Sequence, residues 1–200
     1  MKVIELEQGT PEWHAARRGI PTASGFSKII TSHGKRSTQR EKYLYEIAGE
    51  KLGGIIDETY QSFAMQRGTK MEAEARSLYE FAHAPVQIVG FCLSDCGRWG
   101  CSPDGLIGEK GGLEIKCPLI HTHVEYMLNC KDEIPVEYVQ QVQGALLITG
   151  REWWDFISYF PGLPPVIVRE YPEPTFQRLL KQELESFCDD LNEIVNKLSK

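Results

Sequence analysis

Apolar positions follow two periodicities, which divide the chain into helical and extended parts. Apolar residues three and four positions apart predict helices, and short apolar runs bounded by glycine and proline predict strands. The predicted helices cover residues 26–30, 38–52, 60–82, 123–129, 135–149 and 174–200. The predicted strands cover residues 86–93, 99–102, 113–117, 153–160 and 166–171, with a hairpin return near residues 105–112. This order predicts an α/β or α+β domain with a mixed sheet covered by helices.

The C-terminal segment carries a long amphipathic pattern. Its apolar residues step by threes and fours between residues 174 and 200. They are Phe176, Leu179, Leu180, Leu184, Phe187, Leu191, Ile194, Val195 and Leu198. We expect this helix to pack on the core of its own chain, with a subunit interface as the alternative.

The composition is typical of one soluble globular domain over residues 1–200. Hydrophobic residues make up 42% of the chain and charged residues 25%, and no Pro/Gly/Ser-rich linker separates two halves. No apolar run approaches the length of a membrane span, and residues 1–13 lack the apolar core of a secretory signal. We therefore expect a cytoplasmic location and no membrane partner.

The charge distribution is uneven. A net charge of −6, from 22 basic and 28 acidic residues, argues against a generic basic coat for nucleic acid. The basic residues gather in one stretch near the N-terminus, here called the basic segment. Its members are Lys28, Lys35, Arg36, Arg40 and Lys42. This segment is either solvated surface charge or a basic lip beside an acidic, cation-binding centre.

Six cysteines raise the question of a metal or disulfide framework. Cys92, Cys96 and Cys101 are close together, but the chain has no CxxC pair, and His121 and His123 are poorly spaced for a zinc knuckle. We therefore expect reduced thiols that pack as small apolar residues.

Residues 102–105 and 112–118 carry the candidate chemistry. Side chains alternate along a strand, so Glu114 and Lys116 project from one face and their apolar neighbours from the other. We expect Asp104 to end the preceding strand. If the two strands pair, two carboxylates and one ammonium meet at one sheet edge.

Two adjacent carboxylates repel each other unless a cation holds them. Oxygen ligands suit Mg²⁺ or Mn²⁺, and such an ion beside a lysine suits phosphodiester hydrolysis. Lys116 would position the attacking water or neutralise developing charge. The alternative is a salt-bridged surface hairpin. The apolar neighbours of Glu114, and a further upstream carboxylate at Glu72, favour the site.

Further blocks accompany these residues. They are Gln8-Gly9-Thr10-Pro11-Glu12-Trp13, Arg17, Gly19, Thr22-Ala23-Ser24, Gly68, Glu72, Glu74-Ala75-Arg76 and Tyr138-Val139-Gln140-Gln141-Val142-Gln143. In this order and spacing, the chain resembles the phage lambda-type exonuclease family, also called the YqaJ-like viral recombinase nucleases. That family has the PD-(D/E)xK nuclease core, a central mixed sheet flanked by helices.

The resemblance implies Mg²⁺-dependent digestion of double-stranded DNA from its 5′ ends. The products would be 5′-mononucleotides and a 3′ single-stranded tail for phage-type homologous recombination. Two metal ions are implied, and Mn²⁺ can substitute for Mg²⁺. A bacterial host cytoplasm and a phage or prophage origin are expected.

The resemblance also assigns roles to residues. Asp104, Glu114 and the Ile115 carbonyl would bind the metal, and Lys116 would act on the nucleophilic water. Glu72 would assist a second metal, and Gln141 would line the site. Arg17 and Ser24 would contact the terminal 5′-phosphate. Arginine suits phosphate through its planar fork of donors, and Ser24 lies near a predicted helix start.

One position departs from the family. The lambda enzyme has a further arginine in its phosphate pocket, and the aligned residue here is Thr122. His121, His123 or Arg18 would be the candidates to replace it. The departure bears on the strength of the 5′-phosphate preference and leaves the nuclease chemistry intact.

The family also implies partners. The resemblance implies a homotrimeric ring with DNA passing through its centre. Such a ring needs basic residues only on its inner wall. The basic segment is the candidate for that wall. A single-strand annealing recombinase is the expected recipient of the 3′ tail.

Two other functions are open at this point. One is an endonuclease of restriction or repair type on the same PD-(D/E)xK core, although the absence of an added recognition domain in these 200 residues argues against sequence-specific cleavage. The other is a non-catalytic DNA-binding module, against which the presence of Asp104, Glu114 and Lys116 argues.

Overall fold

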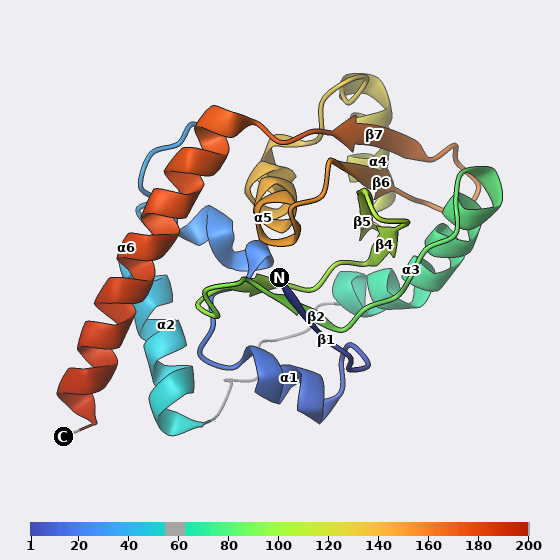
Figure 1. The fold of residues 1–200 in the computed structure, drawn as a ribbon. Helices are drawn as coiled ribbons and strands as arrows, with labels where there is room; N and C mark the ends of the chain where they lie inside the picture. Colours follow the sequence, from blue (N-terminus) through green and yellow to red (C-terminus); the bar gives the residue numbers. More distant parts are fainter. Residues whose placement is uncertain (55–62, 200) are drawn as a thin grey trace.

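The chain forms two β-sheets, and helices lie on both sides of the larger sheet (Figure 1). The computed structural model describes residues 1–54 and 63–199. The first three residues of the helix expected over residues 60–82 therefore lie outside the described residues.

The larger sheet has four strands in the order β4-β5-β6-β7. They are β4 (Gly105–Ile107), β5 (Gly111–Lys116), β6 (Trp153–Ser158) and β7 (Val166–Glu170). β5 and β6 are parallel, and the two outer pairs are antiparallel. The expected mixed sheet is confirmed.

The hairpin differs from the expectation in one respect. Residues 105–107, predicted as part of the turn, form β4 and pair with β5, with Gly105 opposite Leu113. Asp104 therefore stands immediately before β4 and does not end a preceding strand. The change leaves it next to Glu114, because antiparallel pairing continues the same register by one residue.

The smaller sheet consists of three short antiparallel strands. They are β1 (Lys2–Ile4), β2 (Phe91–Leu93) and β3 (Gly100–Cys101). The strand predicted over residues 86–93 is split, because Gln87 exchanges two backbone hydrogen bonds with Leu106 of β4, while β2 pairs with β1 and β3.

Helices account for most of the remaining chain. They are α1 (Pro11–Arg17), the 3-10 helix η1 (Ala23–Lys28), α2 (Arg40–Gly53), α3 (Phe63–Ala82), α4 (Ile120–Asn129), the 3-10 helix η2 (Val136–Tyr138), α5 (Val139–Thr149) and α6 (Pro174–Leu198). α1 was not expected from periodicity, since seven residues give too short a pattern. Its start has a local cause: Pro11 stands in the first turn, and the hydroxyl of Thr10 accepts a hydrogen bond from the Trp13 amide.

The two faces of the larger sheet bury different layers. α5 lies on the face that carries Trp154 and Phe156, and α3 packs on the face that carries Leu113 and Ile157 (Figure 1). Glu114 and Lys116 share the α5 face, because they alternate with Leu113 along β5. The catalytic candidates thus lie between a strand and a helix.

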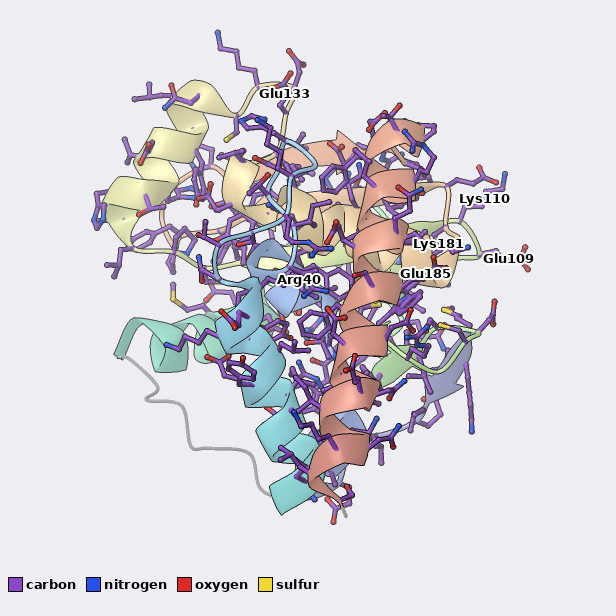
Figure 2. All side chains as sticks on the ribbon, turned by 90° about the vertical axis from the view of Figure 1, so that its left-hand side faces the viewer. Arg40, Glu109, Lys110, Glu133, Lys181 and Glu185 are labelled. Carbon is purple, nitrogen blue, oxygen red and sulfur yellow. The ribbon has the colours of Figure 1, made fainter. Side chains whose placement is uncertain are left out.

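The C-terminal helix α6 packs along α2 and α5, as Figures 1 and 2 show from two sides. Its buried side chains are Phe176, Leu180, Leu184, Phe187, Cys188 and Leu191. The same helix face therefore completes the core of its own chain.

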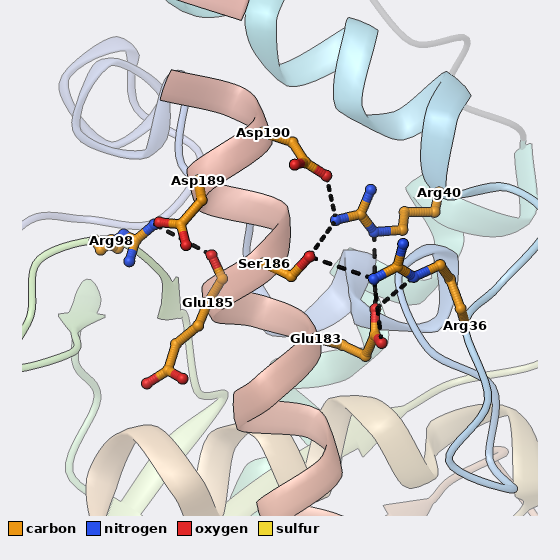
Figure 3. Close-up of polar contacts among 8 residues, drawn as sticks. All are labelled: Arg36, Arg40, Arg98, Glu183, Glu185, Ser186, Asp189 and Asp190. Atoms are coloured by element: carbon orange, nitrogen blue, oxygen red, sulfur yellow. Dashed lines mark hydrogen bonds and ion pairs between the residues drawn. The ribbon is translucent and has the colours of Figure 1, made fainter. Parts of the chain in front are cut away.

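Three residues of the basic segment form ion pairs within the chain, and the expectation that this segment faces DNA stays a prediction. Arg36 pairs with Glu183 at 2.9 Å, and Arg40 pairs with Asp190 at 2.8 Å (Figure 3). Lys28 pairs with Glu46 at 2.9 Å. Three of the five cations are thus neutralised within the chain, because α6 and α2 present carboxylates to them.

The expectation that the cysteines pack as small apolar residues is confirmed for Cys92 and Cys101, which are buried, and is wrong for Cys96, which is exposed. None of the helices in the described part of the chain is both long enough and apolar enough to cross a bilayer.

Candidate active site

Asp104 and Glu114 meet where β4 begins and β5 runs beside it. The amide of Ile115 donates a hydrogen bond to Oδ2 of Asp104 at 2.5 Å, which fixes that carboxylate against β5. The sequence-based expectation that these strands bring Asp104 to Glu114 therefore holds in the geometry.

Glu114 is the most enclosed of the charged residues here, with 3% of its surface exposed. Nζ of Lys116 lies 2.6 Å from its Oε1, and Nε2 of Gln141 donates to the same oxygen at 2.5 Å. A strand residue two positions away and a residue of α5 thus hold one carboxylate from two directions.

Burial and repulsion dominate the electrostatics of this pair. Burial raises the pKa of Asp104 well above its usual range, the neighbouring Glu114 raises it further, and Lys116 opposes the shift. Burial also lowers the pKa of Lys116, but the attraction of Glu114 and Asp104 outweighs burial, and its pKa is raised overall. A second cation beside the pair would favour the ionised form of Asp104, which burial and Glu114 disfavour.

The donor set fits a hard divalent cation. Two carboxylates in one small, water-poor place offer the oxygen ligands that Mg²⁺ and Mn²⁺ accept. The observation that supports this fit is the donor set itself: strand pairing brings the carboxylates of Asp104 and Glu114 together, with the ammonium of Lys116 beside Glu114.

Glu72 reaches the edge of this site from α3. Its Oε1 accepts a hydrogen bond from Nη2 of Arg76 at 2.5 Å, and Nε of Arg76 donates to the carbonyl oxygen of Asp104 at 3.2 Å. In the described part of the chain, no three His, Cys, Asp or Glu side chains come close enough together to hold one ion. A part for Glu72 in a second metal site stays a prediction.

A cavity of about 30 Å³ joins Glu114 to the predicted phosphate residues. Arg17, Ser24, Glu114 and Gln141 are among the residues that line it. The volume has room for a water or an ion rather than for a base. The structure therefore brings together residues from α1, η1, β5 and α5.

Arg17 is held at one wall of this cavity. Its guanidinium carbon lies 3.8 Å from the centre of the Trp13 ring, and Nη2 donates to the hydroxyl of Thr22 at 3.3 Å. Its Nε is buried and has no hydrogen-bond partner in the structure. Burial lowers the pKa of Arg17 from its ordinary value. A buried donor without a partner is costly, which makes it available to an anion.

Ser24 reaches the cavity in a different way from that expected. Thr22, and not Ser24, is the residue before η1, and its side chain caps no amide. Ser24 is exposed, and its hydroxyl lies 3.3 Å from that of Thr22. Because η1 is a six-residue 3-10 helix, its dipole contributes little, and Ser24 offers a hydroxyl only.

Comparison with known proteins places the chain in a family. The family model described as the YqaJ-like viral recombinase domain matches residues 12–152. The chain belongs to this family. Among curated protein sequences, none matches the chain.

Solved structures agree with the family and confirm the fold class. The alkaline exonuclease LHK-Exo from Laribacter hongkongensis is 32% identical over 95% of this chain and 96% of its own, with a TM-score of 0.86. The same enzyme in complex with dAMP matches at 32% identity over 94% and 96%, with a TM-score of 0.85. A phage related exonuclease from Haemophilus somnus 129PT, 14% identical over 90% and 96%, shares the fold at a TM-score of 0.71.

Within this YqaJ-like domain, His123 is excluded as a phosphate ligand. It is fully buried, with Nδ1 2.8 Å from the hydroxyl of Ser158 and Nε2 3.1 Å from the carbonyl oxygen of Pro164. Both ring nitrogens are therefore engaged inside the core. Its neighbour Thr122 is half-buried and His121 is exposed on α4.

Two residues that contact the site had no role in the sequence-based hypothesis. Arg76 touches both Glu72 and Asp104, and the ring of Tyr138 lies 5.1 Å from Nζ of Lys116. The spacing of four between Glu72 and Arg76 was a signal for the first. The contact between Tyr138 and Lys116 joins η2 to β5, and no local pattern predicts it.

Proposed function

We propose that this protein is a Mg²⁺-dependent exonuclease that digests double-stranded DNA from 5′ ends. The observation that carries the proposal is the pairing of β4 with β5, which places the half-buried Asp104 beside the buried Glu114, while Glu114 lines one cavity with Arg17 and Ser24. Membership of the YqaJ-like family supports it, as does the relative at 32% identity that is described as an alkaline exonuclease.

Asp104, Glu114 and the carbonyl of Ile115 would hold the metal ion, with Mn²⁺ able to replace Mg²⁺. Glu72 would contribute to a second ion. When bound, such a metal supplies Lewis-acid polarisation of the phosphoryl oxygen and a bound water of lowered pKa.

The remaining side chains prepare the reaction. Lys116, drawn to Glu114 at 2.6 Å, places a positive charge beside the point where water attacks and negative charge develops. Gln141 donates to Glu114 and so keeps that carboxylate turned toward Lys116. Because Glu114 is buried and Asp104 is tied to the backbone, neither needs to reorganise when substrate arrives.

Arg17 and Ser24 would bind the terminal 5′-phosphate. The unpartnered Nε of Arg17 and the hydroxyl of Ser24 are the donors that the phosphate would use. Anchoring the terminal phosphate beside the metal places the first phosphodiester in the site. Release of 5′-mononucleotides and growth of a 3′ single-stranded tail follow from this arrangement.

The oligomeric state, the protein partner and the cellular location belong to the same proposal. A homotrimeric ring would enclose the duplex, and a single-strand annealing recombinase would receive the tail in the cytoplasm of a bacterial host. The basic segment is the candidate for the inner wall of such a ring, and the side chains of its paired residues Lys28 and Arg36 remain at least partly exposed.

One digestion experiment tests the proposal. Linear duplex DNA with 5′-phosphates is incubated with the protein and Mg²⁺, and a closed circular duplex of the same sequence is the control. We expect mononucleotides and residual single strand from the linear DNA and no cleavage of the circle. Cleavage of the circle would establish an endonuclease instead, and DNA binding without any product would establish a binding module. The variant Asp104→Asn controls for a contaminating nuclease.

A further inference from the structure

Arg76 connects two parts of the chain that carry carboxylates of the site. Its Nη2 donates to Glu72, one turn earlier on α3, and its Nε donates to the backbone carbonyl of Asp104, just before β4. Its side chain is 15% exposed, so solvent competes little for these hydrogen bonds. A single guanidinium thus spans α3 and the active-site hairpin.

This arrangement differs from an ordinary ion pair on a helix surface. A pair at spacing i,i+4 needs only its two charges, and it leaves the other donors in water. Arg76 directs a second donor to a main-chain oxygen 28 residues away. Because guanidinium donors have fixed relative directions, the two hydrogen bonds fix how Glu72 lies relative to Asp104.

α3 is firmly attached to the sheet beside this contact. Ala75 is buried in the sheet face, and the hydroxyl of Tyr79 donates to the buried carboxylate of Asp155 on β6 at 2.5 Å. Arg76 follows Ala75 directly. These contacts fix the position of the helix backbone at Arg76. A displacement of the guanidinium would therefore change the positions of Glu72 and Asp104 and leave the helix in place.

We propose that Arg76 is a positioning residue. It holds the Glu72 carboxylate and the backbone at Asp104 at the relative position that a bound divalent metal ion requires. The proposal rests on the proposed function and adds to it a residue that neither binds metal nor touches the scissile phosphate. A cation cannot ligate a metal ion, so Arg76 acts through Glu72 and Asp104. Its loss is expected to weaken metal binding even without DNA.

The test measures Mn²⁺ affinity by calorimetry on the metal-free protein without DNA, together with thermal unfolding. We expect Arg76→Ala to bind Mn²⁺ about 10- to 100-fold more weakly than the parent, the range typical of lost outer partners of ligands. Arg76→Lys keeps the charge near Glu72 but lacks the paired guanidinium donors. Its Mn²⁺ affinity is expected to lie between those of the parent and Arg76→Ala. Tyr79→Phe, on the same helix, is the matched control: its melting temperature falls while its Mn²⁺ affinity is unchanged.

The outcomes separate this inference from the proposed function. A parent protein that binds no Mn²⁺ and digests no linear DNA would remove the proposed function and the inference with it. A parent that does both, with equal or tighter Mn²⁺ binding in Arg76→Ala, would overturn the role of Arg76 alone. If Arg76→Ala does not fold, Arg76→Lys decides: weaker binding supports the role, and parental binding overturns it.

Discussion

Gln141 on α5 and Glu114 on β5 share a hydrogen bond of 2.5 Å, with the amide nitrogen of the glutamine as donor. The bond joins a helix to a strand, and its two residues are 27 positions apart in the sequence. Lys116 binds the same carboxylate oxygen. The orientation of the buried Glu114 carboxylate therefore depends on Gln141, a residue that carries no charge.

Gln141→Ala is expected to lower the rate of digestion about 10- to 100-fold, because Glu114 loses one of its two partners. The rate on linear duplex DNA at saturating Mg²⁺ measures this. The adjacent Gln140 is the control, since its amide donates to the carbonyl of Ile30 and not to Glu114. Gln140→Ala should lower the free energy of unfolding by about 1 kcal/mol and leave the rate unchanged. Equal losses of rate in both variants would contradict this account of Gln141.

Asp104→Asn is expected to abolish digestion while leaving the metal-free protein at least as stable as the parent. The substitution removes a carboxylate whose ionised form is disfavoured beside Glu114, and the amide oxygen of asparagine can still accept from Ile115. Urea unfolding without metal compares the two proteins. Adding Mg²⁺ should raise the melting temperature of the parent only, because the variant lacks a ligand.

A clear destabilisation of metal-free Asp104→Asn would mean that the carboxylate is held favourably without an ion. Digestion at the parental rate would remove Asp104 from the chemistry. The conservative size of the change makes either result attributable to charge.

The fold was predictable where the local pattern carries the physics. β5, β6, β7 and α6 follow periodicities over five residues or more, and their positions match the expectation within a few residues. β1 and α1 are too short for such a pattern. The strand expected over residues 86–93 divides between two sheets, because its pairing partners lie in other parts of the chain.

The candidate site was likewise predictable where its residues are close in the sequence, and not where it depends on distant parts of the chain. Asp104, Glu114 and Lys116 come from neighbouring segments, so strand geometry was enough to bring them together. His123 shows the limit, since only the packing of α4 reveals that Ser158 and Pro164 occupy both ring nitrogens. The basic segment is a second case: its charges were visible in the sequence, whereas the carboxylates of α6 that pair with Arg36 and Arg40 come about 150 residues later.

Arg17→Met is expected to reduce the preference for 5′-phosphorylated over 5′-hydroxyl ends. The variant keeps a long unbranched side chain but loses the guanidinium, with its contact to the Trp13 ring and every donor that a phosphate could use. Rates on duplexes that differ only in the terminal phosphate measure the preference. Retention of the parental ratio would exclude Arg17 from phosphate binding.

His123→Gln is expected to leave that same ratio unchanged and to lower stability by about 1–3 kcal/mol. The cause is the loss of buried hydrogen bonds to Ser158 and Pro164. Chemical unfolding and the end-preference assay test the two halves. A changed ratio would return His123 to the phosphate pocket.

Arg40→Ala is expected to destabilise the protein more than Arg36→Ala, although both arginines contact α6 (Figure 3). The side chain of Arg40 is 9% exposed and contacts Asp190, Ser186 and the ring of Phe187, whereas that of Arg36 is 54% exposed. We expect losses of about 1–3 kcal/mol for Arg40 and at most about 1 kcal/mol for Arg36. Equal losses in urea unfolding would show that burial does not set the strength of these pairs.

The central claim is that Asp104 and Glu114 together hold a divalent ion. A crystal grown with Mn²⁺ tests it most directly, because anomalous scattering locates manganese independently of the protein atoms. The account predicts an anomalous peak within bonding distance of one oxygen of each carboxylate, and no peak there in Asp104→Asn. An ordered, Mn²⁺-saturated crystal with no peak between the two carboxylates, or with the ion bound elsewhere while digestion proceeds, would contradict it.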